Sequence, residues 1–290
     1  MVNDQASKLR ELMSNQTQEN RHQAKAIAIF SGKGGVGKSN FAINFGLCLA
    51  NRKKKVLLID LDIGMGNVDV LLGASPAYSI VEMLENKMGM FDIIESRSEY
   101  FSFIAAGTSL SRLFELNSAE RTHFIEQLQG VISFFDYILL DLGAGMTKNH
   151  LAFLEAADES IVITTPEPTA ITDSYAAMKH LLIESDNQSI HLSLLINRTT
   201  KNTEGWQVYQ RLREVTKSFL NYQLRFAGSL PDDPTVTESV KKQVPFIESF
   251  PKSRISKQLD KLVTQYEQLE SKKPKQSSTF MEKMKTMLFR

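Results

Sequence analysis

One short segment combines glycines, two lysines and a serine in the order typical of a phosphate-binding loop: Ser31-Gly32-Lys33-Gly34-Gly35-Val36-Gly37-Lys38-Ser39. Glycines allow backbone N–H groups to turn towards an anion, and a helix beginning directly afterwards adds the positive end of its dipole. In such loops Lys38 would contact the β- and γ-phosphates, and the Ser39 hydroxyl would ligate Mg²⁺. The segment predicts a site for ATP or ADP with Mg²⁺, formed by Gly32, Gly34, Gly35, Val36, Gly37, Lys38, Ser39 and Asn40.

A second lysine, Lys33, lies inside this loop, where an ordinary phosphate loop requires no cation. The pattern K-G-G-x-G-K-S resembles the deviant Walker A motif of the MinD/ParA-type ATPases, and the resemblance covers roughly residues 24–250. It implies slow, switch-type ATP hydrolysis in an ATP-bound homodimer. It also implies that Lys33 crosses the dimer interface and contacts the partner's nucleotide. By the same resemblance, Lys33 and Lys38 serve catalysis together with an acid. The alternative is a chance lysine in an ordinary phosphate loop.

Two acidic clusters follow two apolar runs that we expect to be strands: Asp60 and Asp62 after residues 56–59, and Asp141 after residues 137–140. Ligands of open α/β sheets bind at the carboxyl ends of strands, so both clusters should face Lys38. Mg²⁺ prefers oxygen ligands, and a second carboxylate can position an attacking water. Each aspartate alone would more often cap a strand end.

The two clusters resemble switch I and switch II of the same family. The resemblance implies that Asp62 orients or activates the hydrolytic water and that Asp141 is the Walker B-like acid behind Mg²⁺. Asp60 would support the ion without touching it. The metal site is therefore predicted at Ser39, Asp60 and Asp141.

Two later segments suggest how the base is held. Asn197-Arg198 ends an apolar run, and an asparagine side chain offers the donor and acceptor that suit adenine, although it could also cap the strand. By resemblance, Asn197 reads adenine, Arg198 accompanies it, and Pro231 and Asp232 line the base pocket. Glu167 resembles an acid that reaches across the dimer. The sequence after Asn197 lacks the acid of a guanine-specific N-K-x-D motif, which favours ATP over GTP.

The elements that must position these residues alternate between short apolar runs and helical stretches of 10 to 20 residues. Such alternation predicts βαβ units and a parallel sheet buried on both faces. The predicted strands are 26–30, 56–59, 101–105, 137–141, 160–165, 192–196 and 226–229, and residues 252–269 form a closing helix. The fold class is α/β: a single Rossmann-like P-loop NTPase domain over residues 26–270, with an N-terminal arm (1–25) and a C-terminal linker with an amphipathic helix (271–290).

Composition excludes several kinds of protein. The 290 residues carry a net charge of +1, which gives no support for binding nucleic acid and argues against a ParA-like DNA partition protein. The single cysteine, Cys48, fits a reducing compartment and argues against an iron–sulfur reductase with two cluster cysteines per chain. No apolar stretch approaches the ~20 residues of a membrane span, and we see no signal peptide. We therefore expect a cytoplasmic protein whose membrane contact is peripheral.

The C-terminal segment has apolar residues at helical spacing on one face: Phe280, Met281, Met284, Met287 and Leu288. Residues 271–290 hold six basic residues and one acid. A basic amphipathic helix after a polar linker predicts a weak, reversible anchor on the anionic inner face of the cell membrane. The alternative is a helix that docks on its own domain or on a protein partner.

The N-terminal residues Asp4, Gln5, Ala6, Leu9 and Arg10 match the D-Q-A-x-x-L-R segment of the flagellar-number ATPases of the FlhG family, also called YlxH or FleN. The resemblance implies that this segment stimulates the GTPase FlhF, and that flagellar basal-body (C-ring) proteins are further partners. The expected function is control of flagellar placement and number. A division-site ATPase of the MinD type is the main alternative; composition alone would favour a disordered polar terminus.

Overall fold

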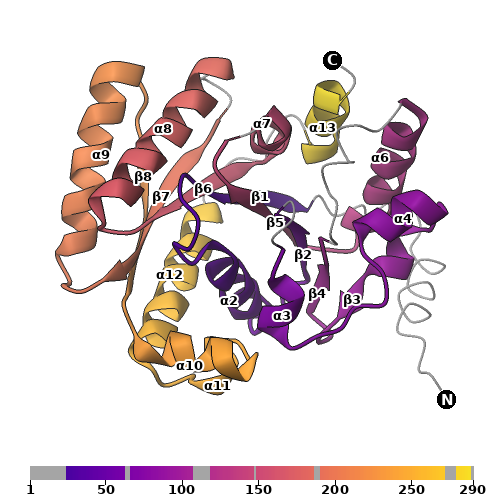
Figure 1. Cartoon of the computed structure of the whole chain (residues 1–290), viewed down its shortest axis with the longest axis horizontal. Helices are drawn as coiled ribbons and strands as arrows, with labels where there is room; N and C mark the ends of the chain where they lie inside the picture. Colours follow the sequence, from indigo (N-terminus) through magenta and orange to yellow (C-terminus); the bar gives the residue numbers. More distant parts are fainter. Residues whose placement is uncertain are drawn as a thin grey trace.

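The computed structural model describes residues 24–62, 66–106, 118–146, 148–185, 190–271 and 279–288. Within them, eight strands form one sheet in the order β3-β4-β2-β5-β1-β6-β7-β8 (Figure 1). The strands are β1 (Lys25–Ser31), β2 (Val56–Leu61), β3 (Glu95–Ser96), β4 (Phe101–Ile104), β5 (Tyr137–Ala144), β6 (Glu159–Thr164), β7 (Leu192–Thr199) and β8 (Arg225–Pro231). All neighbours are parallel except β3 and β4. The predicted α/β class is confirmed.

Helices cover both faces of the sheet (Figure 1). One face carries α2 (Lys38–Ala50), α3 (Val68–Leu72), α11 (Phe246–Ser249) and α12 (Arg254–Glu270), with α10 (Pro234–Lys242) beside α11. The other carries α4 (Ile80–Asn86), the 3₁₀ helix η2 (Met90–Ile93), α6 (Ser118–Ile132), α7 (Lys148–Ala156), α8 (Pro168–Glu184), α9 (Glu204–Leu220) and α13 (Phe280–Leu288).

The central strand explains why the sequence shows continuous apolar runs. Along β1, Ile27 and Ile29 pack towards α2 and α12, whereas Ala28 and Phe30 pack towards the opposite helices. Successive side chains of a strand point to opposite faces, so a strand covered on both sides must be apolar at every position. Every predicted strand is present within a few residues. Strand β3 was not predicted, because its two residues, Glu95 and Ser96, are polar and half-buried at the sheet edge.

The C-terminal helix α13 is docked on the domain. Phe280, Met281 and Met284 are buried in the same core cluster as apolar residues of α6 and α7. On the exposed side of α13, Lys285 Nζ donates a hydrogen bond to Gln129 Oε1 at 2.9 Å. Of the two alternatives that the sequence left open, this conformation is the docked one. The side chains of Met287 and Leu288 lie outside the described residues.

The N-terminal arm, including the Asp4–Arg10 motif, also lies outside the described residues, because the description begins at Ala24. Among the helices that are described, none has the length and apolar character needed to cross a bilayer.

Candidate active site

The phosphate-binding loop joins the end of β1 to the start of α2, as predicted. Gly37 precedes the helix with φ of 91°, and a Cβ there would lie 2.5 Å from Asn197 Nδ2. Only glycine satisfies both the left-handed backbone and this close approach. Among the described residues, no side chain caps the N-terminus of α2, and its first turn holds no acid. The N–H groups and positive dipole end of this helix thus remain for an anion.

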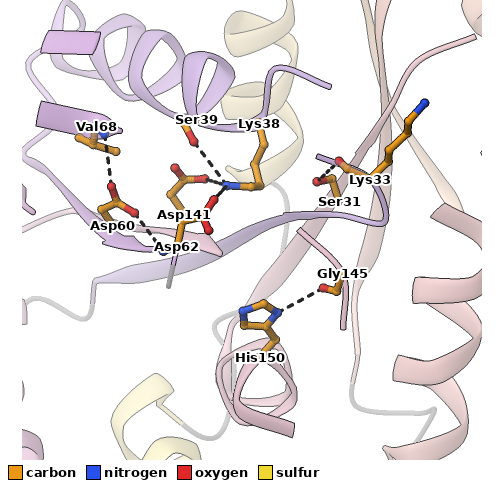
Figure 2. Close-up of polar contacts among 10 residues, drawn as sticks. All are labelled: Ser31, Lys33, Lys38, Ser39, Asp60, Asp62, Val68, Asp141, Gly145 and His150. Carbon is orange, nitrogen blue, oxygen red and sulfur yellow. Dashed lines mark hydrogen bonds and ion pairs between the residues drawn. The ribbon is translucent and has the colours of Figure 1, made fainter. Parts of the chain in front are cut away.

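Lys38 connects the loop to both acidic clusters (Figure 2). Its Nζ lies 2.8 Å from Asp141 Oδ1 and 3.4 Å from Asp62 Oδ2. Burial lowers the pKa of Lys38, but the charge and hydrogen bond of Asp141, with the charges of Asp62 and Asp60, outweigh it and leave the pKa above its ordinary value. Lys38 is therefore a permanent cation at the point where the three predicted acids meet.

Asp60 and Asp141 are neighbours because β2 and β5 pair in parallel register at these two positions. Both carboxyl groups are almost fully buried. Burial, and then the charge of Asp141, raise the pKa of Asp60 to about 7. Burial also raises the pKa of Asp141, against the charge and hydrogen bond of Lys38 and a hydrogen bond from Ser39. A divalent cation placed here would relieve the repulsion between the two acids.

The two oxygens of Asp60 hold the ends of the switch I segment. Oδ1 accepts a hydrogen bond from the Asp62 backbone N–H at 3.0 Å, and Oδ2 accepts one from the Val68 N–H at 3.2 Å. Of the residues between Asp62 and Val68, residues 63–65 lie outside the described part. This geometry agrees with a supporting position for Asp60, while Asp62 faces the cleft beside Lys38.

The donor set fits Mg²⁺ held mainly by phosphates and water. The second carboxylate oxygen of Asp141 is buried and accepts no hydrogen bond within the described part of the chain. No group of three or more His, Cys, Asp or Glu among the described residues could hold a metal alone. Mg²⁺ typically takes one or two protein oxygens and keeps several waters, so Ser39 and Asp141 with a nucleotide would suffice.

Lys38, Ser39 and Asp62 line part of a cleft of about 1180 Å³, whereas Asp60 and Asp141 lie buried behind its wall. Of the predicted site, the cleft brings together Gly34, Gly35, Gly37, Lys38, Ser39, Asn40, Asp62, Glu167, Asn197, Arg198, Pro231 and Asp232. Gly32 and Val36 do not line it: a Cβ on Gly32 would lie 2.1 Å from the Asp173 carbonyl oxygen, and Val36 is buried. These two residues therefore contribute loop backbone rather than cleft-facing side chains.

Asn197 has a contact that the sequence did not indicate. Its Nδ2 donates a hydrogen bond to the Val36 carbonyl at 2.8 Å, which ties the end of β7 to the phosphate loop. One amide hydrogen is thus used within the protein, while the residue still borders the cleft with Arg198 and Asp232. An asparagine in this place can hold the loop and still offer its oxygen to a base.

Lys33 points away from Lys38 (Figure 2). Its Nζ lies 3.1 Å from Glu167 Oε2 and 2.8 Å from Thr169 Oγ1, and its side chain is 37% exposed. The two residues predicted to reach across a dimer are therefore adjacent, at the mouth of the cleft. Glu167 is also exposed.

Sequence reasoning missed much of the cleft wall. It is also lined by Asn67, Val70, Thr165, Thr200, Glu204, Val236, Val240 and Ile255. Thr165 could have been predicted from the sequence, since it directly follows β6 at the same edge of the sheet as the aspartates. Its buried Oγ1 neither accepts nor donates a hydrogen bond within the described residues. The cleft residues of α10 and α12 carry no such signal in the sequence, because only folding brings them to the cleft.

Comparison with known proteins agrees with this geometry. Residues 22–267 match the ParA family model, described as NUBPL iron-transfer P-loop NTPase. The chain belongs to the ParA/MinD family of P-loop ATPases. The iron-transfer role in that description is not supported by a pair of cysteines in this chain. Its single cysteine, Cys48, is buried in α2.

Two curated relatives of this ATPase cover most of its length. It is 32% identical to "Antiactivator FleN" of Pseudomonas aeruginosa over 81% of the chain and 83% of that protein. It is 33% identical to "Flagellum site-determining protein YlxH" of Helicobacter pylori over 90% of the chain and 89% of that protein. The septum site-determining protein MinD of Pyrococcus horikoshii, complexed with Mg-ADP, shares the fold with a TM-score of 0.69 at 22% identity, covering 87% of this chain and 100% of that one.

The raised pKa of Asp60 generates a first prediction. Because the pKa of Asp60 is raised to about 7, part of the Asp60 population carries a proton near neutral pH, and a cation beside it favours the carboxylate. Binding of Mg-ADP near neutral pH should therefore release protons. Titration calorimetry in buffers of different ionisation enthalpy measures this release. Asp60→Asn should abolish most of it; equal release from that variant would contradict the assignment.

Proposed function

We propose that this ATPase is a dimerising switch in which ATP closes two chains face to face. The observation that carries the proposal is the division of labour between the two loop lysines. Lys38 is buried on Asp141 and Asp62, whereas Lys33 extends from the opposite side of the loop at the cleft mouth. A cation in that position can contact phosphates presented from outside the chain.

The contacts of Lys33 support its transfer to a partner. The pair with Glu167 is exposed, and exposed ion pairs contribute only about 0–1 kcal/mol. Exchanging Glu167 for a partner's phosphates therefore costs little. In the closed dimer, Asp62 orients the hydrolytic water, and Lys38 and the loop N–H groups hold the phosphates. Ser39 and Asp141 would hold Mg²⁺, which would supply positive charge against the phosphates.

The proposed roles predict opposite results for two variants. Lys33→Ala should bind ADP within about two-fold of wild type yet remain monomeric with ATP, because it loses only the contact made across the interface. Asp62→Ala should form a lasting ATP dimer and hydrolyse ATP about 100-fold more slowly. Light scattering after size exclusion and phosphate release measure both. Lys38→Ala, which should lose nucleotide altogether, is the control. An ATP dimer of Lys33→Ala would refute the crossing lysine.

We further propose that release of α13 carries the ATP dimer to the membrane. The docked helix buries Phe280, Met281 and Met284, so its apolar face must leave α6 and α7 before it can meet lipid. Burial of such side chains is worth about 1.5–3 kcal/mol each in either location, so the exchange is close to balanced. Two helices on one dimer shift the balance through their combined binding, aided by the basic residues of the tail.

Liposome sedimentation tests this step. Binding should increase with ATP and with the fraction of anionic lipid, and deletion of residues 280–290 should reduce it to background. Leu269→Glu, which alters an exposed apolar residue of α12, should leave it unchanged. Equal sedimentation with ADP and ATP would contradict release by dimerisation.

The cellular output that we propose is the control of flagellar placement and number. The proposal is supported by the similarity to FleN and YlxH over most of the chain and by the match of Asp4–Arg10 to the activator segment of that family. The arm would insert polar and cationic groups beside the phosphates of an FlhF-type GTPase. The alternative, a MinD-type division-site ATPase, is supported by relatives at about 29% identity.

A synthetic peptide of residues 1–12 should accelerate GTP hydrolysis by FlhF at least several-fold. The Gln5→Ala and Arg10→Ala peptides should be weaker, since they lose groups that would approach the GTPase site. The same substitutions in the full chain should leave ATP-dependent dimerisation unchanged. No stimulation by either the peptide or the full-length chain would favour the MinD-type alternative.

A further inference from the structure

His150, on α7, lies beside the switch II turn but belongs to none of the family motifs described above. Its side chain is 4% exposed, and its Nδ1 lies 3.2 Å from the Gly145 carbonyl oxygen (Figure 2). Burial lowers the pKa of His150, so the ring is neutral at neutral pH. Because a carbonyl oxygen only accepts, Nδ1 carries the hydrogen and donates it to Gly145.

Gly145 is tied on its other side to the phosphate loop. Its backbone N–H donates to the Ser31 carbonyl at 2.9 Å, at the end of β1. The Ser31 hydroxyl in turn donates to the Lys33 carbonyl at 2.9 Å. Hydrogen bonds therefore link His150 through Gly145 and Ser31 to the backbone of the loop lysine that faces outwards. Figure 2 shows the first and the last of these bonds.

His150 also lies next to the hydrolytic side of the site. A Cβ added to Gly143 would lie 2.8 Å from Asp62 Oδ1 and 3.5 Å from His150 Cε1. Asp62 and the imidazole thus both border the space that the missing side chain of Gly143 leaves open. A shift of the switch II turn that carries Gly143 would therefore alter the surroundings of both groups.

Helix α7 also supports α13. Phe153 and Leu154 of α7 belong to the same core cluster as Phe280, Met281 and Met284, and the two helices pack directly against each other. A single helix of nine residues thus carries His150 at the nucleotide site and apolar contacts with the C-terminal helix.

We propose that His150 is a positioning residue that couples the phosphate-binding loop and Asp62 to the docking of α13. This inference rests on the proposed release of α13 with ATP. When phosphates draw Lys33 and switch II into the closed site, the Gly145 turn moves, His150 follows its carbonyl partner, and α7 loses its fit to α13. The element with two arrangements is α13 itself, docked or released.

Kinetics separate positioning from a structural role. His150→Leu keeps an apolar side chain of similar size but loses the donor, and should lower kcat at least five-fold while KM for ATP changes less than two-fold. His150→Asn retains an N–H at the place of Nδ1, and should recover most of kcat. Equal losses in both variants would mean that the imidazole only fills space, and unchanged kcat in His150→Leu would also overturn the proposal.

The coupling is measured as a distance between spin labels on Glu126→Cys of α6 and Thr286→Cys of α13, both exposed positions. Cys48 is buried and its pKa is raised to about 12, so it will not compete for the label. In the otherwise wild-type protein, Mg²⁺ with a non-hydrolysable ATP analogue should lengthen the distance. With His150→Leu the analogue should still bind, as calorimetry would show, without lengthening it.

The measured distance distinguishes the role of His150 from the release of α13. If the distance lengthens equally in both proteins, the role of His150 is overturned and the release of α13 stands. If it does not change in the otherwise wild-type protein, the release of α13 fails, and the coupling fails with it.

Discussion

The buried ion pair of Lys38 and Asp141 is the constraint on which the site depends. Neither charge is stable alone at this depth, since desolvation of a single ion costs several kcal/mol and removal of one partner leaves the other uncompensated. The pair joins the start of α2 to β5, and Asp62 completes it from the position that follows β2. Phosphates and Mg²⁺ bound here would replace these contacts with stronger ones, so the residues proposed to bind the nucleotide also support the structure.

The register of the sheet creates the second constraint. Because β2 and β5 place Asp60 directly beside Asp141, two carboxylates share a dry environment with one lysine. Burial, and then the charge of Asp141, raise the pKa of Asp60, and a cation placed here would favour its carboxylate form. The backbone N–H groups of Asp62 and Val68 hold Asp60 in place, so the acid proposed to lie near the metal also holds both ends of the switch I segment.

The C-terminal helix α13 has an apolar face that is buried in the domain. The C-terminal helix has a sequence suited to a lipid surface, yet its apolar face completes the core between α6 and α7. Because the hydrophobic effect is non-directional, the side chains that complete the core are equally suited to a lipid surface. Helix α7 lies between α13 and the nucleotide site. It packs against α13, and its N-terminal turn lies beside switch II.

Several features followed from sequence alone. Seven strands were predictable because strands covered on both faces are apolar throughout, and α2 and α12 because of their periodicity. The phosphate loop was predictable because glycine placement encodes its backbone, and the acids because parallel strand ends converge. Strand β3 escaped prediction because two half-buried polar residues carry no pattern.

Other features were decided only by the tertiary structure. The contacts of Lys33 with Glu167 and Asn197 with Val36 join residues more than 130 positions apart, and nothing local specifies such partners. The same is true of the docking of α13, since an amphipathic helix indicates that a face will be buried but not against what. Local sequence fixes backbone conformation and periodicity, whereas the choice of partner depends on which segments the complete sheet brings within a few ångströms.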